Sequence, residues 1–233
     1  MGRAGPDRSA VVVTRICTTE KSFMMTTLNV GDALAWIARF AGEAEDQFDA
    51  LTDLDRLVGD GDFGMNLRSG LRSAVRRIDQ DPPSDPGGAF ARVSDAFLDT
   101  GGTSGPLLGL WFGRIGTVSG NSVTATDFAS ALNEATAAVQ RLGNAQVGHK
   151  TMVDAMVPAA AALSDSAATG ATVFAALEAA ADAAQRGAES TRSMLARRGR
   201  ATYVGEHARG VEDPGAAAIA MFFDAAQQEC DPA

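Results

Sequence analysis

The chain of 233 residues has only two lysines and two cysteines, and no apolar run is long enough to span a bilayer. Its formal charge is −9, from 20 lysines and arginines against 29 acidic residues. Nucleic acids and anionic membrane surfaces require a basic face on the protein that binds them. The N-terminus also lacks the sustained apolar segment of a signal peptide. We therefore expect neither nucleic acid nor a membrane among the partners of this protein.

The two cysteines, Cys17 and Cys230, lie near opposite ends of the chain. Two isolated cysteines provide neither a metal-binding motif nor a disulfide framework. A single structural bridge between them is the alternative, but we interpret both as reduced thiols of a cytoplasmic protein.

Strand patterns are also scarce, because β-branched alternation is rare and no hairpin dipeptide separates two such runs. Apolar residues instead recur at spacings of three and four, as they do on one face of a helix. The pattern predicts a single all-α domain of about eight helices, with functional loops at one end. The expected helices cover approximately residues 34–48, 67–78, 90–97, 104–118, 126–141, 151–163, 172–195 and 215–228.

Residues 1–25 differ from the rest of the chain because they are polar and irregular, with one short strand-like run. Met24 and Met25 stand just before the first periodic segment. We interpret residues 1–25 as a disordered extension upstream of a natural start at one of these methionines, and residues 26–233 as the domain.

A cluster of acidic residues and glycines is the most informative local feature. Residues 60–64 read Asp-Gly-Asp-Phe-Gly and closely follow Asp53 and Asp55. Carboxylates crowded in this way repel one another unless a hard divalent cation lies between them. The glycines allow backbone angles at which neighbouring oxygens converge, and the amides of a following helix can face an anion. The cluster predicts a site for Mg²⁺-bound phosphate, although an ordinary surface turn uses the same residue types.

Four further segments combine glycine with polar residues at expected helix ends: residues 101–106, 143–154, 199–203 and 213–216. Thr103 or Ser104 is expected to cap a helix, where free amides could also bind phosphate. The segment is not a Walker A loop, because the required lysine is absent. Lys150 either meets a phosphate or an acid or is a solvated side chain at a helix end. Arg200 either neutralises phosphate or belongs to a basic helix end.

The remaining polar candidates carry weaker signals. Asp213 and Pro214 are typical of a capped helix start. His149 and His207 have no serine or cysteine partner at a diagnostic spacing, so we interpret both as polar loop residues and predict no nucleophilic triad.

Five motifs occur in a fixed order: Asp-x₄-Asp-Gly-Asp-x-Gly, Gly-Gly-Thr-Ser-Gly-Pro, Gly-x-Lys-Thr-Met-x-Asp, Gly-Arg-Ala-Thr-Tyr-x-Gly-Glu and Asp-Pro-Gly-Ala. In this order they resemble the nucleotide-binding L subunit of dihydroxyacetone kinase, and the resemblance covers about residues 27–229. It implies an eight-helix barrel whose loops at one end hold ADP or ATP with two Mg²⁺ ions.

The resemblance also implies roles for particular residues. Asp55, Asp60 and Asp62 match the metal-binding aspartates, and Arg200 matches a catalytic residue that offsets developing negative charge. The implied nucleotide contacts are Phe63, Gly64, Met65, Asn66, Thr103, Ser104, Gly143, Met152, Arg200, Asp213, Pro214 and Gly215. Two positions depart from the family pattern: Phe63 stands where the family usually has histidine, and His149 where an acid is more common.

The implied activity is phosphoryl transfer to an alcohol group of a small ketose, dihydroxyacetone or a tetrulose. In the family, a separate K subunit binds the ketose, so the chain is expected to be active only with that partner. The donor stays open between free ATP and a phosphotransferase-system M subunit that rephosphorylates ADP, and a homodimer also stays open. Because of Phe63, the alternative is a non-catalytic ADP/ATP-binding regulatory module that docks on a partner protein. A fatty-acid kinase is less favoured, because the further domains of that protein are missing.

Overall fold

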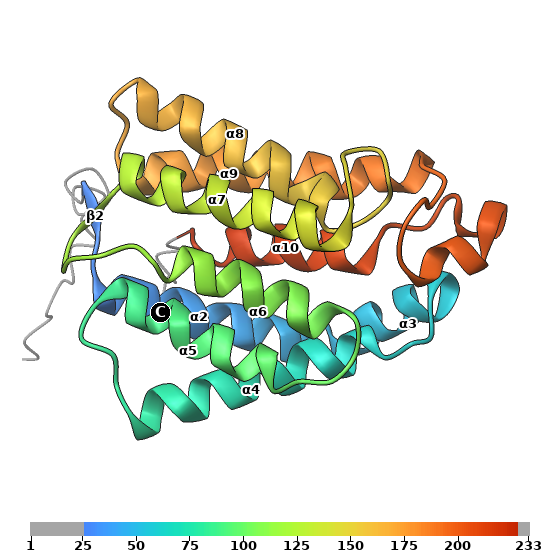
Figure 1. The fold of residues 1–233 in the computed structure, drawn as a ribbon, viewed down its shortest axis with the longest axis horizontal. Helices are drawn as coiled ribbons and strands as arrows, with labels where there is room; N and C mark the ends of the chain where they lie inside the picture. The colour runs from blue at the N-terminus through green and yellow to red at the C-terminus, as the bar shows by residue number, and fades with distance from the viewer. Residues whose placement is uncertain (1–25, 228–233) are drawn as a thin grey trace, which may run out of the picture.

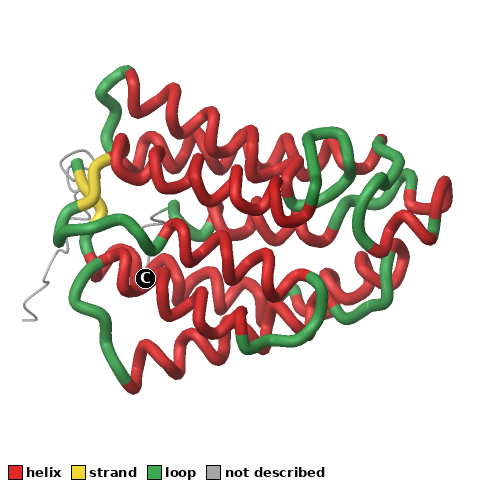
Figure 2. The backbone as a smooth tube through the Cα atoms, in the orientation of Figure 1, coloured by secondary structure: helices red, strands yellow, loops and turns green. Residues whose placement is uncertain are grey.

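The computed structural model describes residues 26–227, so the predictions for residues 1–25, for Cys17 and for Cys230 lie outside the described residues. Within this range the chain is helical apart from one short antiparallel strand pair (Figures 1 and 2). The helices are α2 (Val30–Asp46), α3 (Phe48–Val58), α4 (Phe63–Gln80), α5 (Pro86–Leu98), α6 (Ser104–Ile115), α7 (Ala125–Gly143), α8 (Val153–Ala168), α9 (Val173–Ser190) and α10 (Pro214–Asp224). The strands are β1 (Thr27–Leu28) and β2 (Val123–Thr124), and three 3₁₀ turns are η1 (Thr191–Ser193), η2 (Arg200–Tyr203) and η3 (Gly205–Ala208).

Eight helices form a closed ring of contacts, because each helix from α4 to α9 packs on the next helix in the chain and α2 packs on both α4 and α10. These eight are the helices that the apolar spacing predicts, so the all-α barrel is confirmed. The boundaries shift slightly: α7 begins after Thr124, which caps it in place of the expected Thr126, and α8 begins at Val153 in place of Thr151.

Helix α3 is a ninth helix of the described part of the chain, and the sequence pattern did not predict it. The first helix was expected to end near Phe48. It ends instead at Asp46. The backbone of the next residue, Gln47, leaves the helical region (φ −97°, ψ 12°), and α3 starts at Phe48. Three of the four buried residues of α3, namely Leu51, Asp55 and Val58, recur at spacings of three and four. Helix α3 lies at the end of the barrel opposite the strand pair (Figure 1). It carries Asp55 to that end.

The core of the barrel is centred on α10, which is buried along nearly its whole length. Phe222 stacks on Trp36 with 4.4 Å between ring centroids, and it meets Phe40, Trp111 and Phe112 edge-on. Offset and edge-to-face pairs of this kind stabilise beyond the area that they bury. The indole N–H of Trp36 also donates a hydrogen bond of 2.6 Å to the carbonyl oxygen of Phe222. The first and last helices of the barrel are thereby joined.

Consecutive barrel helices run in opposite directions, so the loops divide between two ends (Figure 1). The strand pair lies at one end, and we call the opposite end, where α4, α6, α8 and α10 begin, the loop end. Within residues 26–227, no helix combines the length and the apolar character that crossing a membrane requires.

Candidate functional site

The loop end of the barrel contains a cavity of about 230 Å³. Its walls come from the first turns of α4, α6, α8 and α10, the ends of α3 and α7, and residues 198–201. Most residues that the resemblance implicates meet in this one cavity. They are Asp55, Asp60, Asp62, Phe63, Asn66, Thr103, Ser104, Gly143, Met152, Arg200, Asp213, Pro214 and Gly215.

Two residues of the expected nucleotide loop do not line the cavity. Gly64 faces α3, where an added Cβ would lie 2.4 Å from Thr52 Oγ1 and 2.9 Å from the carbonyl oxygen of Phe48. A side chain at this position would separate α3 from α4. Met65 is 48% exposed on the outer surface of α4. The structure therefore gives Gly64 a packing role and turns the Met65 side chain away from the cavity.

At three of the four helices that begin at the cavity, the residue in the N-cap position does not cap the helix with its side chain. Asp62, Thr103 and Met152 occupy the N-cap positions of α4, α6 and α8, and none makes a side-chain cap hydrogen bond. The expectation that Thr103 or Ser104 caps α6 is therefore wrong. Thr103 has helical backbone angles (φ −81°, ψ −32°), whereas a capping residue normally lies in the extended region. The first N–H of α4 is instead bound by Asp55 Oδ2, and the first N–H of α8 by Thr151 Oγ1. The dipoles of helices that begin at one cavity still favour an anionic ligand there.

The acidic cluster is held by backbone hydrogen bonds and by arginine. Asp55 is buried and its Oδ2 accepts a hydrogen bond of 3.0 Å from the backbone N–H of Phe63. Burial raises the pKa of Asp55, the backbone hydrogen bond opposes this, and the negative charge of Asp60 raises it further. The carboxylate of Asp60 forms an ion pair with the guanidinium of Arg200. Gly61 turns the chain between the aspartates with a left-handed φ of 79°.

Arg200 reaches Asp60 because a small apolar cluster fixes its segment. Val58 at the end of α3 packs against Ala201 of η2 and Ala208 of η3. This contact places η2 beside the acidic turn, although the two segments are far apart in the sequence. It also explains how Arg200 and Asp60 reach one cavity.

The acidic cluster can be tested as a metal site. In the present arrangement, no three acidic, histidine or cysteine side chains of residues 26–227 are gathered closely enough to hold an ion. Asp60 instead binds a cation of the chain itself, the guanidinium of Arg200. Carboxylate oxygens are the ligands that Mg²⁺ prefers. The carboxylates are thus of the chemical type that Mg²⁺ requires, although they are not gathered around one point here, and the ion pair with Arg200 shows that Asp60 stabilises positive charge.

Phe63, where the resemblance leads us to expect histidine, has an 8% exposed side chain that belongs to the hydrophobic core. Its backbone N–H, not its side chain, makes the polar contact with Asp55. The ring also lines the cavity and adds an apolar surface there. Phenylalanine offers no side-chain donor for a phosphate at this position.

The opposite wall of the cavity joins the start of α8 to the start of α10. Gly215 lies against Met152, because an added Cβ would be 3.3 Å from Met152 Cβ. Asp213 caps α10 by accepting a 2.8 Å hydrogen bond from the backbone N–H of Ala216, as the sequence predicts. Burial raises the pKa of Asp213 to about 7, while the Ala216 hydrogen bond and the ammonium group of Lys150 act in the opposite direction.

Lys150 contributes to this wall, although the sequence left its role open. The solvated alternative is wrong, because Lys150 is 1% exposed. Its ammonium group donates hydrogen bonds to the carbonyl oxygens of Thr191 and Val211. Neither of these acceptors has a sequence signal. Arg198 also lines the cavity and was not predicted, and its Nε donates a 2.7 Å hydrogen bond to the carbonyl oxygen of Asn144.

The two histidines have no catalytic partner in the described structure. His149 Nδ1 accepts a hydrogen bond of 3.2 Å from the backbone N–H of Gln146, within the same loop. His207 lies on η3 and is exposed. Neither residue is among those that line the cavity. This arrangement agrees with the expectation that both are polar loop residues.

The family model of the DAK2 domain matches residues 57–228. The chain belongs to the DAK2 domain family. It is 35% identical over 187 residues to the ADP-binding subunit DhaL of the PEP-dependent dihydroxyacetone kinase of Escherichia coli, an alignment that covers 79% of this chain and 89% of that subunit. It is 38% identical over 178 residues to the L-erythrulose 1-kinase of Mycolicibacterium smegmatis, where it covers 74% of this chain and 31% of the relative. These matches confirm the resemblance to the L subunit.

A solved structure shows the same fold. The dihydroxyacetone kinase of C. freundii in complex with AMP-PNP and Mg²⁺ superposes with a TM-score of 0.64 at 27% identity. The match covers 95% of this chain and 38% of the kinase chain. The chain therefore corresponds to a little over a third of that kinase, and it matches the DhaL subunit over most of the subunit's length.

Proposed function

We propose that this DAK2 protein is the nucleotide- and Mg²⁺-binding subunit of a dihydroxyacetone-type kinase, and that it delivers a phosphoryl group from ATP to a small ketose held by a separate K-type subunit. The observation that carries the proposal is the loop-end cavity, in which Asp55, Asp60 and Asp62 lie together with the starts of α4, α6 and α8. The likeness to an ADP-binding subunit and to a kinase with bound AMP-PNP and Mg²⁺ supports it.

Each side of the cavity has a distinct task in this proposal. The three aspartates would hold two Mg²⁺ ions, which supply charge neutralisation for phosphate oxygens when bound. Phe63, Asn66, Thr103 and Ser104 stand at the first turns of α4 and α6, where backbone amides can hold phosphate oxygens.

Arg200 is the catalytic residue of the proposal. It pairs with Asp60 at the acidic side of the cavity, so its guanidinium is already close to the expected phosphate position. Its planar donors can offset the negative charge that develops during transfer. Transfer itself depends mainly on positioning and on neutralisation of charge.

The opposite wall suits the nucleoside. Met152, Leu107 and Val139 give it an apolar surface, and Gly143 and Gly215 leave space beside that surface. Methionine is soft and packs well against flat rings. Asp213 and Pro214 complete the wall at the start of α10. The cavity therefore offers an acidic end for the metal-bound phosphates and an apolar end for the base.

The surface around the cavity supports a partner-dependent enzyme. Among residues 26–227, every large apolar side chain found exposed comes from a segment at the loop end. Exposed apolar side chains gathered on one face are typical of a contact surface. We propose that this face receives the K-type subunit, which brings the ketose to the cavity mouth. The exposed side chains are those of Leu57, Met65, Leu98, Leu142, Val147, Leu195 and Tyr203.

Nucleotide binding and phosphoryl transfer test the proposal in two steps. Calorimetry should detect AMP-PNP or ADP binding by the chain alone, and only with Mg²⁺. With a K-type subunit and ATP, phosphorylated dihydroxyacetone or erythrulose should appear, and the preferred ketose identifies the substrate. An M-type phosphotransferase protein tests the second donor, because it should replace ATP only if the chain works with bound ADP. Absence of Mg²⁺-dependent nucleotide binding would refute the proposal as a whole.

Phe63 favours a second candidate, a non-catalytic ADP/ATP-binding module that docks on a regulator. A buried phenylalanine provides neither a hydrogen bond nor a proton where the family usually has histidine. This module would bind Mg²⁺-nucleotide but transfer no phosphoryl group to any three- or four-carbon ketose. Phe63→His separates the two candidates, because transfer that appears only in the variant would support the module.

A further inference from the structure

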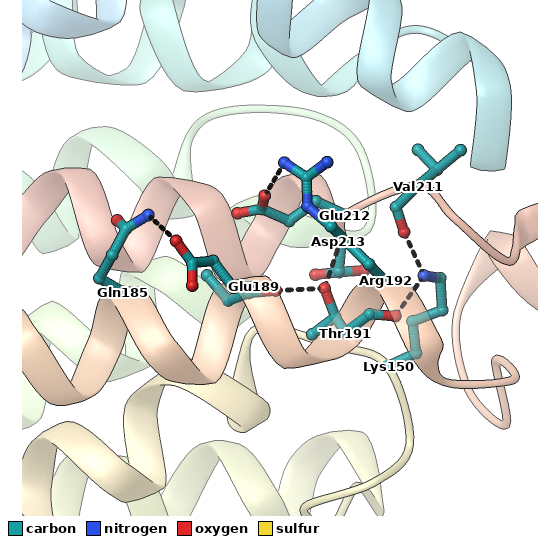
Figure 3. Close-up of polar contacts among 9 residues, drawn as sticks. Lys150, Gln185, Glu189, Thr191, Arg192, Val211, Glu212 and Asp213 are labelled. Atoms are coloured by element: carbon teal, nitrogen blue, oxygen red, sulfur yellow. Dashed lines mark hydrogen bonds and ion pairs between the residues drawn. The ribbon is translucent and has the colours of Figure 1, made fainter.

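The buried amino group of Lys150 connects three segments that meet beside the cavity. Lys150 precedes α8, Thr191 follows the end of α9, and Val211 lies just before α10. The Nζ of Lys150 donates a 2.6 Å hydrogen bond to the carbonyl oxygen of Thr191 and a second hydrogen bond to that of Val211. Figure 3 shows the amino group between these two oxygens. One side chain therefore cross-links segments 41 and 61 residues away in sequence.

Asp213, which the cavity exposes, belongs to the same network. Its backbone N–H donates a 2.9 Å hydrogen bond to Thr191 Oγ1, so the two carbonyl acceptors of Lys150 and the start of α10 are linked (Figure 3). The carboxylates that surround Lys150 are Asp213, Asp154 and Glu212, and Arg192 is the nearby cation. Glu212 is engaged by Arg192 at 2.8 Å, and Asp154 accepts hydrogen bonds from the backbone N–H groups of Gly148 and Thr151.

The backbone at Lys150 indicates that its side chain is needed. Its φ is +60°, a left-handed conformation that favours glycine. Among the described residues, only Asn144 and Lys150 adopt it without being glycine. Asn144 ends α7, where asparagine is a common left-handed residue, but lysine has no such preference. The conformation sends the Lys150 side chain inward, to the two carbonyl oxygens.

We propose that Lys150 is a positioning residue of the nucleotide site. Its ammonium group holds residues 211–215 against the start of α8, so that Asp213 and Gly215 stay beside Met152 as one wall of the cavity. The assignment of this wall to the nucleotide rests on the proposed function, whereas the cross-link itself does not. The two described hydrogen bonds of the Lys150 ammonium group both go to backbone carbonyl oxygens.

Two substitutions of Lys150 distinguish a role of its charged donors from a role of its packing alone. Lys150→Met has a similar length but no donor, and Lys150→Arg is bulkier but keeps the charge and the donors. If the cross-link matters, arginine should preserve function better than methionine. If only packing matters, methionine should be the better substitute in this buried place. Arg209→Met is the matched control, because Arg209 is exposed and pairs with Glu206 on η3.

The measurements are amide hydrogen exchange over residues 211–216 and calorimetric affinity for AMP-PNP with Mg²⁺, both on the full chain. In Lys150→Met we expect exchange faster and affinity weaker, each on the order of tenfold, because two charge-assisted hydrogen bonds are lost. The exchange rate and affinity of Lys150→Arg should lie between those of Lys150→Met and the wild type, and those of Arg209→Met should equal the wild-type values. Helical circular dichroism should be unchanged in all three.

The outcomes are distinguishable. The proposal would be overturned if Lys150→Met had the same exchange rate and nucleotide affinity as the wild type. It would also be overturned if Lys150→Met kept these properties better than Lys150→Arg. If Lys150→Met does not fold, Lys150→Gln takes its place, and its neutral amide should again be inferior to arginine. If the wild type binds no Mg²⁺-nucleotide, the proposed function fails, while the exchange measurement still decides whether Lys150 holds residues 211–216.

Discussion

The two ends of the barrel differ in how they satisfy their helix N-termini. At the strand end, all four helices that begin there have a capping side chain, and each cap accepts a hydrogen bond from a backbone N–H of the first turn. Two of these caps are reciprocal capping boxes. Each such cap stabilises a helix by about 1 kcal/mol. The capping residues are Asn29, Asp85, Thr124 and Thr172.

At the loop end, α10 is the one of the four barrel helices whose N-cap residue makes such a hydrogen bond, and the N-cap residues of α4, α6 and α8 do not. The first N–H groups of α4 and α8 are bound by Asp55 and Thr151 instead. The same end holds the crowded aspartates and further buried or partly buried charged residues, among them Lys150, Asp154 and Asp213. Such features lower stability unless a ligand completes them. The comparison teaches that the strand end and the aromatic core maintain the fold, whereas the loop end leaves polar groups available for binding.

The aromatic core should show the largest effect on stability alone. Phe222→Ala removes the ring that stacks on Trp36 and meets Trp111, so the free energy of unfolding should fall by about 3–5 kcal/mol. Urea denaturation followed by circular dichroism measures this loss. Tyr203→Ala is the control at the loop end, because its side chain is 91% exposed, and it should change stability by less than about 0.5 kcal/mol. Equal losses in both variants would break the comparison.

The acidic turn should show the opposite behaviour, with a large effect on binding and a small one on folding. Asp60→Ala and Asp62→Ala should each weaken Mg²⁺-dependent ADP binding on the order of 100-fold, because each removes a carboxylate proposed to hold the ions. Calorimetry with and without Mg²⁺ measures the effect, and helical circular dichroism should be retained.

Asp53→Ala provides the matched control for the acidic turn. Asp53 is also an aspartate near the turn, but it is exposed and pairs with Arg56 on the outer face of α3. Its removal should leave Mg²⁺-dependent ADP affinity within about twofold, since exposed ion pairs contribute little. Normal ADP binding by Asp60→Ala, or an equal loss in Asp53→Ala, would contradict the assignment of the metal site.

The contact between α3 and α4 should affect both the stability of the fold and binding at the loop end. An alanine at Gly64 would place its Cβ 2.4 Å from Thr52 Oγ1, so Gly64→Ala should destabilise the fold by about 1–3 kcal/mol and also weaken Mg²⁺-nucleotide binding. Gly42→Ala is the control, because nothing lies within 4 Å of its added Cβ in α2, and it should stabilise by about 0.5–1 kcal/mol. A Gly64→Ala variant as stable as the wild type would show that α3 is not held there.

The barrel could be predicted from the sequence because its signal is local. Apolar spacing of three and four recurs in each of the eight helices that close the ring. Helix α3 was not predicted, because neither proline nor glycine marks the break at Gln47 and the acidic residues that follow are typical of a turn. The start of α10 was predicted with its cap, since Asp213 and Pro214 act within a single turn.

The sequence predicted which residues form the candidate site, but not the contacts that these residues make. Ordered motifs identified the aspartates and the cavity residues, and the structure brings most of them together. The burial of Lys150 was not predictable, because its acceptors are backbone carbonyl oxygens 41 and 61 residues away, and any residue type provides such an oxygen. The pairing of Arg200 with Asp60 likewise depends on Ala201 and Ala208 packing against Val58, which are small residues without a distinctive pattern.

Asp213 should give the stability of the protein a pH dependence that arises at the loop end. Because burial raises its pKa to about 7 in the folded protein, from 3.8 ordinarily, the folded state retains this proton between these values while the unfolded state loses it. Stability from this group is therefore complete below pH 3.8 and is lost as the pH rises through 7, by at most about 1.4 kcal/mol per pH unit. Asp213→Asn keeps an oxygen that can cap α10 but cannot titrate. Urea denaturation from pH 4 to pH 8 should show the wild type losing stability relative to Asp213→Asn, and a constant difference between them would show that Asp213 titrates normally.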